Sequence, residues 1–208
     1  RTLLFCLICA LLPLHAAAQQ RPFDYYVLSL SWSPNWCATQ GNARGAAQCG
    51  AERGLGWSLH GLWPQYTTGY PSYCPLGQRP PSRRDTARMT PIMGSAGLAW
   101  HQWKKHGTCT GLSGKDYFAT SRAAYGAITR PAAFRNLDTT VRLPASVVED
   151  AFLAANPLLR PNGVVVTCKS GHIQEVRICL THDLEPRRCG RDVDRACTLN
   201  NALLEPIP

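Results

Sequence analysis

Four segments of the chain have the hydrophobic pattern of β-strands. Residues 25–32 (YYVLSLSW) alternate imperfectly between apolar and polar side chains and are rich in aromatic residues, which favours a strand. Residues 56–63 (GWSLHGLW) predict a second strand. Residues 163–168 and 172–180 predict a third and a fourth, and residues 169–171 (KSG) between them are typical of a tight hairpin.

Helical patterns fill the middle of the chain. Residues 95–106 are expected to form a helix with Gly107 as its C-terminal cap. Residues 114–127 predict another helix, and residues 145–155 predict a third that stops at the following Asn-Pro pair. Strands, then helices, then a hairpin indicate an α+β fold with a central antiparallel sheet flanked by helices.

The first 18 residues differ in character from the rest. A basic residue precedes an almost wholly apolar run, and three alanines follow it, which is the layout of a secretory signal peptide. A buried N-terminal helix is the alternative interpretation. Residues 19–208 suit a single domain, since no repeat or linker divides them. The Pro/Arg-rich run 79–88 is expected to be an exposed loop.

Cysteine usage agrees with export. Two of the ten cysteines lie within residues 1–18, which leaves eight. An even number in an exported chain predicts disulfide bonds, and the sequence spacing alone does not select one pairing. The absence of a CxxC pair argues against a zinc ribbon or a thioredoxin-like motif. The fold is therefore expected to be stabilised by disulfides.

The charge balance narrows the range of partners. The chain has 22 Lys and Arg against 13 Asp and Glu, a formal net charge of +9. Such an excess favours polyanions or acidic surfaces, so RNA and a cell-wall polyanion both remain possible partners.

Residues 100–109 (WHQWKKHGTC) combine imidazole, ammonium and amide groups on the predicted helix. Residues four apart share a helix face, so His101 pairs with Lys105, and Gln102 pairs with His106. A zinc site of the zincin type needs histidines four apart and a neighbouring glutamate. Here the histidines are five apart and no carboxylate occurs from 86 to 115. A solvated basic helix end is the structural alternative.

Acid–base chemistry on a phosphodiester is the third interpretation of this segment. Metal-free RNA cleavage needs a base for the 2′-OH, an acid for the departing 5′-oxygen and positive charge against the phosphorus. Two histidines suit the first two tasks because their ordinary pKa lies near 6.5. A lysine suits the third. Residues 58–65 (SLHGLWPQ) contain His60, which provides a second imidazole from a predicted strand.

At these residues the chain resembles a known family. SLHGLWP and HQWKKHGTC look like the two active-site segments of the ribonuclease T2 family, metal-independent endoribonucleases with little base preference. Residues 25–37 also resemble the first strand and first cysteine of that family. The resemblance runs from about residue 24 to about residue 197.

The resemblance implies a role for each matching side chain. His60 corresponds to the general acid and His106 to the general base. Lys105 corresponds to the lysine that stabilises the transition state, and His101 to a histidine that holds the phosphate. The implied product is first a 2′,3′-cyclic phosphate, which water opens later. The resemblance also implies four disulfides, namely Cys37–Cys49, Cys74–Cys109, Cys168–Cys197 and Cys179–Cys189.

The implied base-binding side chains are Trp63 and Tyr70. The chain departs from the family pattern at two positions. Gln102 stands where the family usually has Glu, and Gln65 where it often has an acidic side chain or Asn. An amide still forms hydrogen bonds but takes no proton and carries no charge. Gln102, one helical turn before His106, is expected to contact it and to leave its pKa lower than a Glu would.

The sequence therefore predicts a secreted or periplasmic endoribonuclease with RNA as its partner, acting as a monomer without a metal or other cofactor. A catalytically weakened relative that binds RNA or a partner protein is the first alternative, and Gln102 is the feature that favours it. A basic cell-wall or glycan-binding protein is the second, and only charge supports it.

Overall fold

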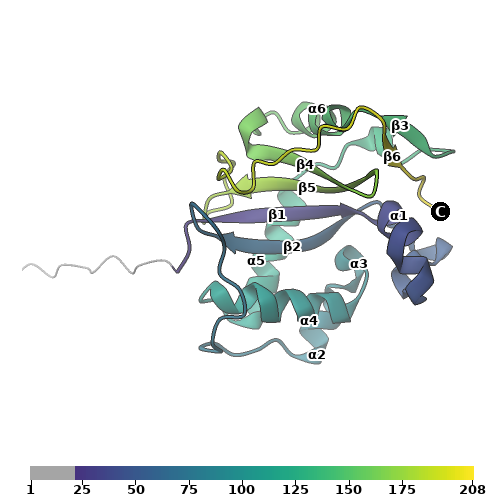
Figure 1. Cartoon of the computed structure of the whole chain (residues 1–208). Helices are drawn as coiled ribbons and strands as arrows, with labels where there is room; N and C mark the ends of the chain where they lie inside the picture. Colours follow the sequence, from purple (N-terminus) through teal and green to yellow (C-terminus); the bar gives the residue numbers. More distant parts are fainter. Residues whose placement is uncertain (1–21) are drawn as a thin grey trace, which may run out of the picture.

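A central sheet organises the computed structural model, which describes residues 22–208 (Figure 1). The expected signal peptide, 1–18, lies outside the described residues. The six strands are β1 (Tyr25–Trp32), β2 (Trp57–Gln65), β3 (Val141–Leu143), β4 (Val164–Lys169), β5 (His172–Leu180) and β6 (Ala202–Leu204). The six α-helices are α1 (Ser33–Trp36), α2 (Arg83–Arg88), α3 (Thr90–Met93), α4 (Ala96–Lys105), α5 (Gly114–Ala127) and α6 (Ala145–Ala155).

The sheet is antiparallel apart from one contact. Strands β2, β1 and β5 follow one another, and β4 pairs with β5. The short strands β6 and β3 join at the hairpin end of β5, where β6 runs parallel to it. In Figure 1, α4 lies beyond the β2 edge and α6 beyond the β4 edge. The predicted α+β fold, with a central antiparallel sheet flanked by helices, is confirmed.

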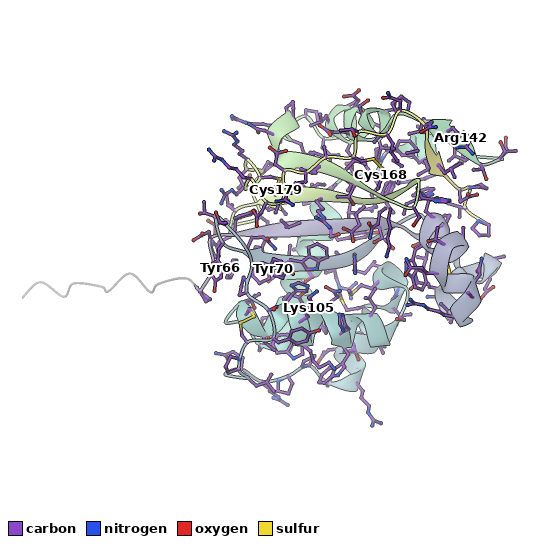
Figure 2. All side chains as sticks on the ribbon, viewed as in Figure 1. Tyr66, Tyr70, Lys105, Arg142, Cys168 and Cys179 are labelled. Carbon is purple, nitrogen blue, oxygen red and sulfur yellow. A yellow bond between two sulfur atoms is a disulfide. The ribbon has the colours of Figure 1, made fainter. Side chains whose placement is uncertain are left out.

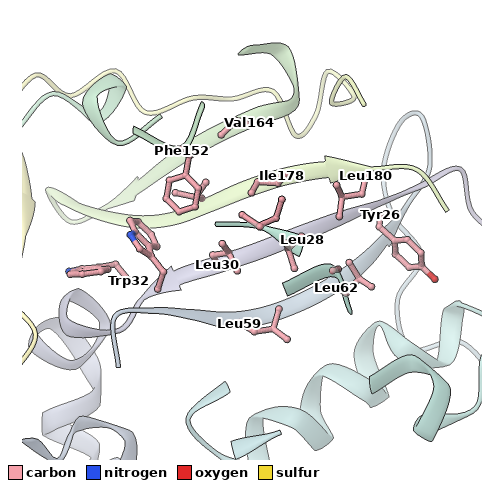
Figure 3. Packing of buried hydrophobic residues seen from close by; sticks show 14 of the residues in the cluster. Tyr26, Leu28, Leu30, Trp32, Leu59, Leu62, Phe152, Val164, Ile178 and Leu180 are labelled. Carbon is pink, nitrogen blue, oxygen red and sulfur yellow. The ribbon is translucent and has the colours of Figure 1, made fainter. Parts of the chain in front are cut away.

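One face of the sheet carries the main core. Alternate residues of β1, β2 and β5 are fully buried there against the helices (Figure 3). Leu28 and Leu30 of β1 face Leu59 and Leu62 of β2, and Ile178 of β5 continues the layer. The opposite face of the same strands carries a second, smaller apolar cluster that includes Tyr25, Val27 and Cys179. Beside that cluster, small and polar side chains form the floor of the cleft described below.

The predicted hairpin between β4 and β5 is confirmed. Lys169 pairs with His172, so the turn consists of Ser170 and Gly171. Both have positive φ angles, 51° and 78°. Two left-handed residues in a two-residue loop match the right-handed twist of the flanking strands.

Two sequence-based expectations are wrong in detail. The helix at 96–105 ends with His106 as its cap residue, and Gly107 begins a 3₁₀ turn with no left-handed φ. The run 79–88 is also not wholly a loop, because its second half forms α2. Ser82 and Asp85 make a capping box there, in which each side chain bonds the backbone N–H of the other. That pairing satisfies two backbone donors at the helix start.

Four disulfides link the described part of the chain, with S–S distances near 2 Å. Their pairings are Cys37–Cys49, Cys74–Cys109, Cys168–Cys197 and Cys179–Cys189, the four that the family resemblance implies. Cys74–Cys109 ties the loop after β2 to the 3₁₀ turn that follows α4, and Cys179–Cys189 holds the chain after β5 against the sheet. The disulfides thus fix loops that border the cleft.

Candidate active site

A β-bulge places His60 in the cleft. The pairing of β1 with β2 shifts by one residue between Ser29 and Leu30, which leaves His60 without a partner on β1. In a regular strand, residues three apart point to opposite faces. The extra residue changes this phase, so His60 and Trp63 line the same cleft with ring centroids 5.3 Å apart. Bulges often re-aim a side chain in this way beside functional sites.

The second wall of the cleft is the C-terminal end of α4. His101 is exposed, Lys105 is partly buried, and Gln102 and His106 are buried. The helix packs beside β2, which brings its last turn against the bulged strand. Figure 2 shows Lys105 near Tyr70, which the loop after β2 carries.

One cleft of about 550 Å³ collects every catalytic and base-binding residue that the sequence singled out. Those eight residues are His60, Trp63, Gln65, Tyr70, His101, Gln102, Lys105 and His106. The sequence pattern placed one group of these residues on a predicted helix and the other group on a predicted strand or just after it. Their meeting across the cleft depends on how α4 packs against β2.

The environment of His106 favours its neutral form. The ring is only 4% exposed and stacks on Trp63 at 5.2 Å with an interplanar angle of 24°. Its buried Nδ1 atom has no hydrogen-bond partner. Burial first, and then the positive charges of Lys105, His60 and His101, lower the pKa of His106 to about 3. An imidazole in this setting is unprotonated at neutral pH and can accept a proton.

Gln102 has a different partner from the expected one. Its Oε1 accepts a hydrogen bond from the indole Nε1–H of Trp63 at 2.8 Å. Among residues 22–208, no hydrogen bond joins its side chain to that of His106. Because Trp63 stacks on His106, Gln102 acts on the imidazole by fixing the ring that covers it.

A glycine follows each of the two histidines for a packing reason. A Cβ atom on Gly61 would lie 2.3 Å from Gln102 Oε1 and 2.4 Å from Trp63 Nε1. A Cβ atom on Gly107 would lie 2.3 Å from the ring of Trp103. Neither position has room for a side chain. The glycine after each histidine is therefore explained by close packing of its neighbours.

Two charged residues of β5 at this site were missed by the sequence analysis. Nδ1 of His60 lies 2.6 Å from Oε1 of Glu175, which is only 1% exposed. Arg177 donates to the other carboxylate oxygen from Nε at 3.0 Å and from Nη2 at 2.8 Å. Residues 175 and 177 are two apart on a predicted strand, so they share a face, and a charged pair inside an apolar strand was the available signal.

The Glu175 carboxyl is ionised despite its burial. Burial alone raises its pKa, but the hydrogen bond and charge of His60 and the charge and hydrogen bonds of Arg177 outweigh it. Together they hold the pKa of Glu175 at about 2. An ionised carboxylate only accepts hydrogen bonds, so Nδ1 of His60 is the donor.

Aromatic and polar side chains surround the far end of the cleft. Tyr70 is 54% exposed, and its ring lies 6.4 Å from His106. The Arg177 guanidinium lies over Trp63 at 5.5 Å, and Gln65 is buried beside them. Exposed aromatic rings beside cations are suited to stacking a nucleobase.

A second groove continues the cleft past His60. It has a volume of about 500 Å³ and is lined by Ser31 and Ser58 of the sheet and by Ser33 at the start of α1. His60 and Glu175 line both grooves, so they stand where the two meet. An extended ligand crossing this boundary would pass directly over His60.

Two further findings concern the described part of the chain. Within residues 22–208, no three His, Cys, Asp or Glu side chains are grouped so that they could hold a metal ion. None of the helices in that range has the length and apolar character that crossing a bilayer requires.

Comparison with known proteins decides the family. The model of the ribonuclease T2 family matches residues 23–189. The chain belongs to the ribonuclease T2 family. A ribonuclease of Aeromonas hydrophila is 46% identical over 103 residues, which cover 49% of this chain and 45% of that protein. A probable ribonuclease of Haemophilus influenzae is 35% identical over 123 residues, covering 53% of this chain and 45% of that protein.

Solved structures agree on the ribonuclease T2 fold. An RNase-related protein from Calystegia sepium superposes with a TM-score of 0.64 at 21% identity, covering 89% of this chain and 97% of its own. At that identity the likeness concerns the fold. The chain spans about half the length of the curated relatives that it matches.

Proposed function

We propose that the protein is a metal-independent endoribonuclease that cleaves single-stranded RNA through a 2′,3′-cyclic phosphate. The observation that carries the proposal is the neutral, buried imidazole of His106 facing a second imidazole, His60, across one cleft that also contains an ammonium group. Membership of the ribonuclease T2 family supports the same chemistry.

In the proposed first step, His106 acts as the general base. It takes the proton of the ribose 2′-OH as that oxygen forms a bond to phosphorus. A base must be unprotonated to act, and burial beside cations keeps His106 in that form. Trp63, stacked on the ring and held by Gln102, fixes the direction of its nitrogen atoms.

His60 acts as the general acid in the same step. The bond from phosphorus to the 5′-oxygen breaks as His60 gives that oxygen a proton, so one proton is taken and one is returned. Lys105 lies on the opposite wall and places positive charge against the phosphate. His101 lies on the same wall, and because burial and the nearby lysines lower its pKa, it is proposed to hold the phosphate by a hydrogen bond. Charge fixed before the reaction stabilises the extra negative charge of the pentacoordinate phosphorus.

Base binding is proposed for Trp63, Tyr70 and Gln65. Stacking on aromatic rings is worth about 1–3 kcal/mol per base and tolerates any base. Broad base preference therefore follows from the two rings. Gln65 is buried at this end of the cleft, where its amide offers both a donor and an acceptor.

RNA cleavage in excess EDTA tests the proposal. The protein should cleave single-stranded RNA and leave cyclic phosphate ends, while His60→Ala and His106→Ala should each be slower by about 10²–10⁴-fold. Cleavage that EDTA abolishes and zinc or magnesium restores would contradict the two-histidine mechanism. Near-normal turnover in either variant would remove that histidine from its role.

A weakened, RNA-binding relative is the second candidate, favoured by Gln102 in place of the usual glutamate. Its prediction is distinct, because RNA would bind without being cut. Measuring RNA binding and cleavage on the same preparation separates the two candidates.

Export to the periplasm or the exterior is proposed on two grounds. The first 18 residues have the layout of a signal peptide. The four disulfides require an oxidising compartment to form and persist.

A further inference from the structure

The contact between His60 and Glu175 spans the strand that separates them. β1 lies between β2 and β5, and neighbouring strands are about 4.8 Å apart, so the two side chains meet above β1. The residues of β1 that lie on this face between His60 and Glu175 are Ser29 and Ser31. Their small side chains leave the space that an imidazole and a carboxylate need in order to touch at 2.6 Å.

A second bulge lies next to Glu175 in β5. The pairing of β4 with β5 shifts between Thr167 and Cys168, and Gln174 is left without a partner. Ile173 and Val176 are both in the core although they are three residues apart. As in β2, the bulge turns two successive residues toward the cleft, here Gln174 and Glu175. Glu175 keeps the regular alternation that it shares with Arg177, and the bulge adds Gln174 to the same face, whereas in β2 the bulge residue is His60 itself.

The geometry points to Glu175 as the positioning residue of the proposed general acid, with Arg177 holding the carboxylate in place. Glu175 uses one oxygen for His60 and the other for Arg177, so its orientation is fixed at both ends. Because Nδ1 of His60 donates to Glu175, the opposite nitrogen, Nε2, is left to carry the transferable proton. This inference rests on the proposed function and deepens it.

The charges around His60 explain why such an anion is needed. Lys105 faces it from the α4 side, together with the imidazoles of His101 and His106, and Arg177 faces it from β5. A cleft built to hold a phosphate is rich in cations, and cations disfavour protonation of a nearby imidazole. Glu175 is the carboxylate in contact with His60, and it counters that effect locally. Besides their difference in burial, the two histidines differ in that, among residues 22–208, His60 has an anionic partner and His106 has none.

A leaving-group comparison tests this role. Glu175→Gln keeps the shape of the side chain and removes its charge. On a dinucleoside phosphate we expect kcat/KM to fall by about 10²-fold, within the contribution of a general acid. The leaving group of a uridine 3′-(4-nitrophenyl phosphate) departs as a stable anion. Protonation of the leaving group by the acid therefore contributes little to the rate on this substrate. On that substrate kcat/KM of Glu175→Gln should remain within a few-fold of the wild-type value. In contrast, kcat/KM of His106→Ala should fall strongly on both substrates.

The pH profile gives an independent reading of the same variant. The basic limb of kcat/KM reports the acid of the free enzyme. Removing the anion beside the acid should move that limb to lower pH and leave the acidic limb, which reports the base, in place. Glu175→Asp keeps the charge but has a shorter side chain, so its basic limb should lie between those of wild type and Glu175→Gln. Glu185→Gln, an exposed change of the same charge, serves as the matched control.

Several outcomes would overturn the inference. Equal losses on both substrates would mean that Glu175 only maintains the fold, and unchanged rates would mean that it has no role. Should Glu175→Gln fail to fold, ¹⁵N chemical shifts of the wild-type histidines decide, because His60 must carry its neutral-form proton on Nδ1. Finding the proton of the neutral form on Nε2 in place of Nδ1 would refute the assignment. Failure of the proposed function is distinguishable, since wild type would then not cleave RNA at all.

Discussion

Replacing Gln102 with glutamate introduces one negative charge next to the proposed general base, His106, whose surroundings are cationic. Gln102 is buried and lies one helical turn before His106, and its amide oxygen holds Trp63 against the imidazole. A carboxylate oxygen can accept the same indole hydrogen bond. Gln102→Glu should therefore preserve the packing and change the electrostatics. The cations that lower the pKa of His106 would be opposed by an anion.

The size of the effect follows from the helix geometry. Residues four apart have Cβ atoms about 6 Å apart, and at an effective dielectric constant of about 20 two unit charges then interact by roughly 3 kcal/mol. That energy corresponds to about two pKa units. An opposite charge favours the protonated imidazole, so the shift is upward. The acidic limb of kcat/KM should move from about pH 3 in the wild type to roughly pH 5 in the variant.

The assay is a pH–rate profile on one dinucleoside phosphate, from about pH 3.5 to 8. At pH 4 the variant should be about tenfold below its own plateau, while the wild type stays near its plateau. Circular dichroism at each pH verifies that the protein is folded. Gln78→Glu, which adds the same charge in an exposed loop, should leave the limb in place. A limb that stays put or moves down in Gln102→Glu would refute the coupling, and a wild-type limb near pH 6.5 would refute the buried neutral His106.

Three further predictions concern stability. The unfolded chain protonates His106 near its ordinary pKa while the folded pKa is about 3, so stability is lost as pH falls through this window. Between pH 7 and pH 4.5 the free energy of unfolding, measured by urea titration, should fall by roughly 2–3 kcal/mol. This decrease should be smaller in His106→Gln. An equal decrease in both proteins would contradict burial of a neutral ring. Gly61→Ala should lower the unfolding free energy by about 1–3 kcal/mol, because the new Cβ atom collides with Gln102; an unchanged melting temperature would show that the site relaxes freely. Replacing Cys179 and Cys189 together with alanine should cost about 2–4 kcal/mol, and peptide mapping that finds either thiol free in the wild type would reject the bond.

The periodic elements were readable from the sequence because their signal is local. Alternating apolar residues at 25–32 and 172–180 define strands wherever the sheet lies, and residues 114–127 and 145–155 match their helices to the residue. The two histidine segments were recognisable for a similar reason, since each is a long and unusual run of residues. Helix ends were harder to predict because their signals depend on tertiary packing. Gly107 resembled a left-handed cap in sequence, but close packing against Trp103 is what excludes a side chain there.

The tertiary structure alone decided how the candidate site is assembled. The bulge at His60 changes the phase of β2, and a strict alternation of inward and outward residues would have placed His60 and Trp63 on opposite faces. Glu175 is 115 residues away from His60, and their contact depends on strand order and on small residues in the intervening strand. The sequence by itself fixed which side chains are chemically able to move a proton. Which of them is buried, paired or left neutral depends on neighbours that only the folded chain brings within a few ångströms, because desolvation and charge act through space.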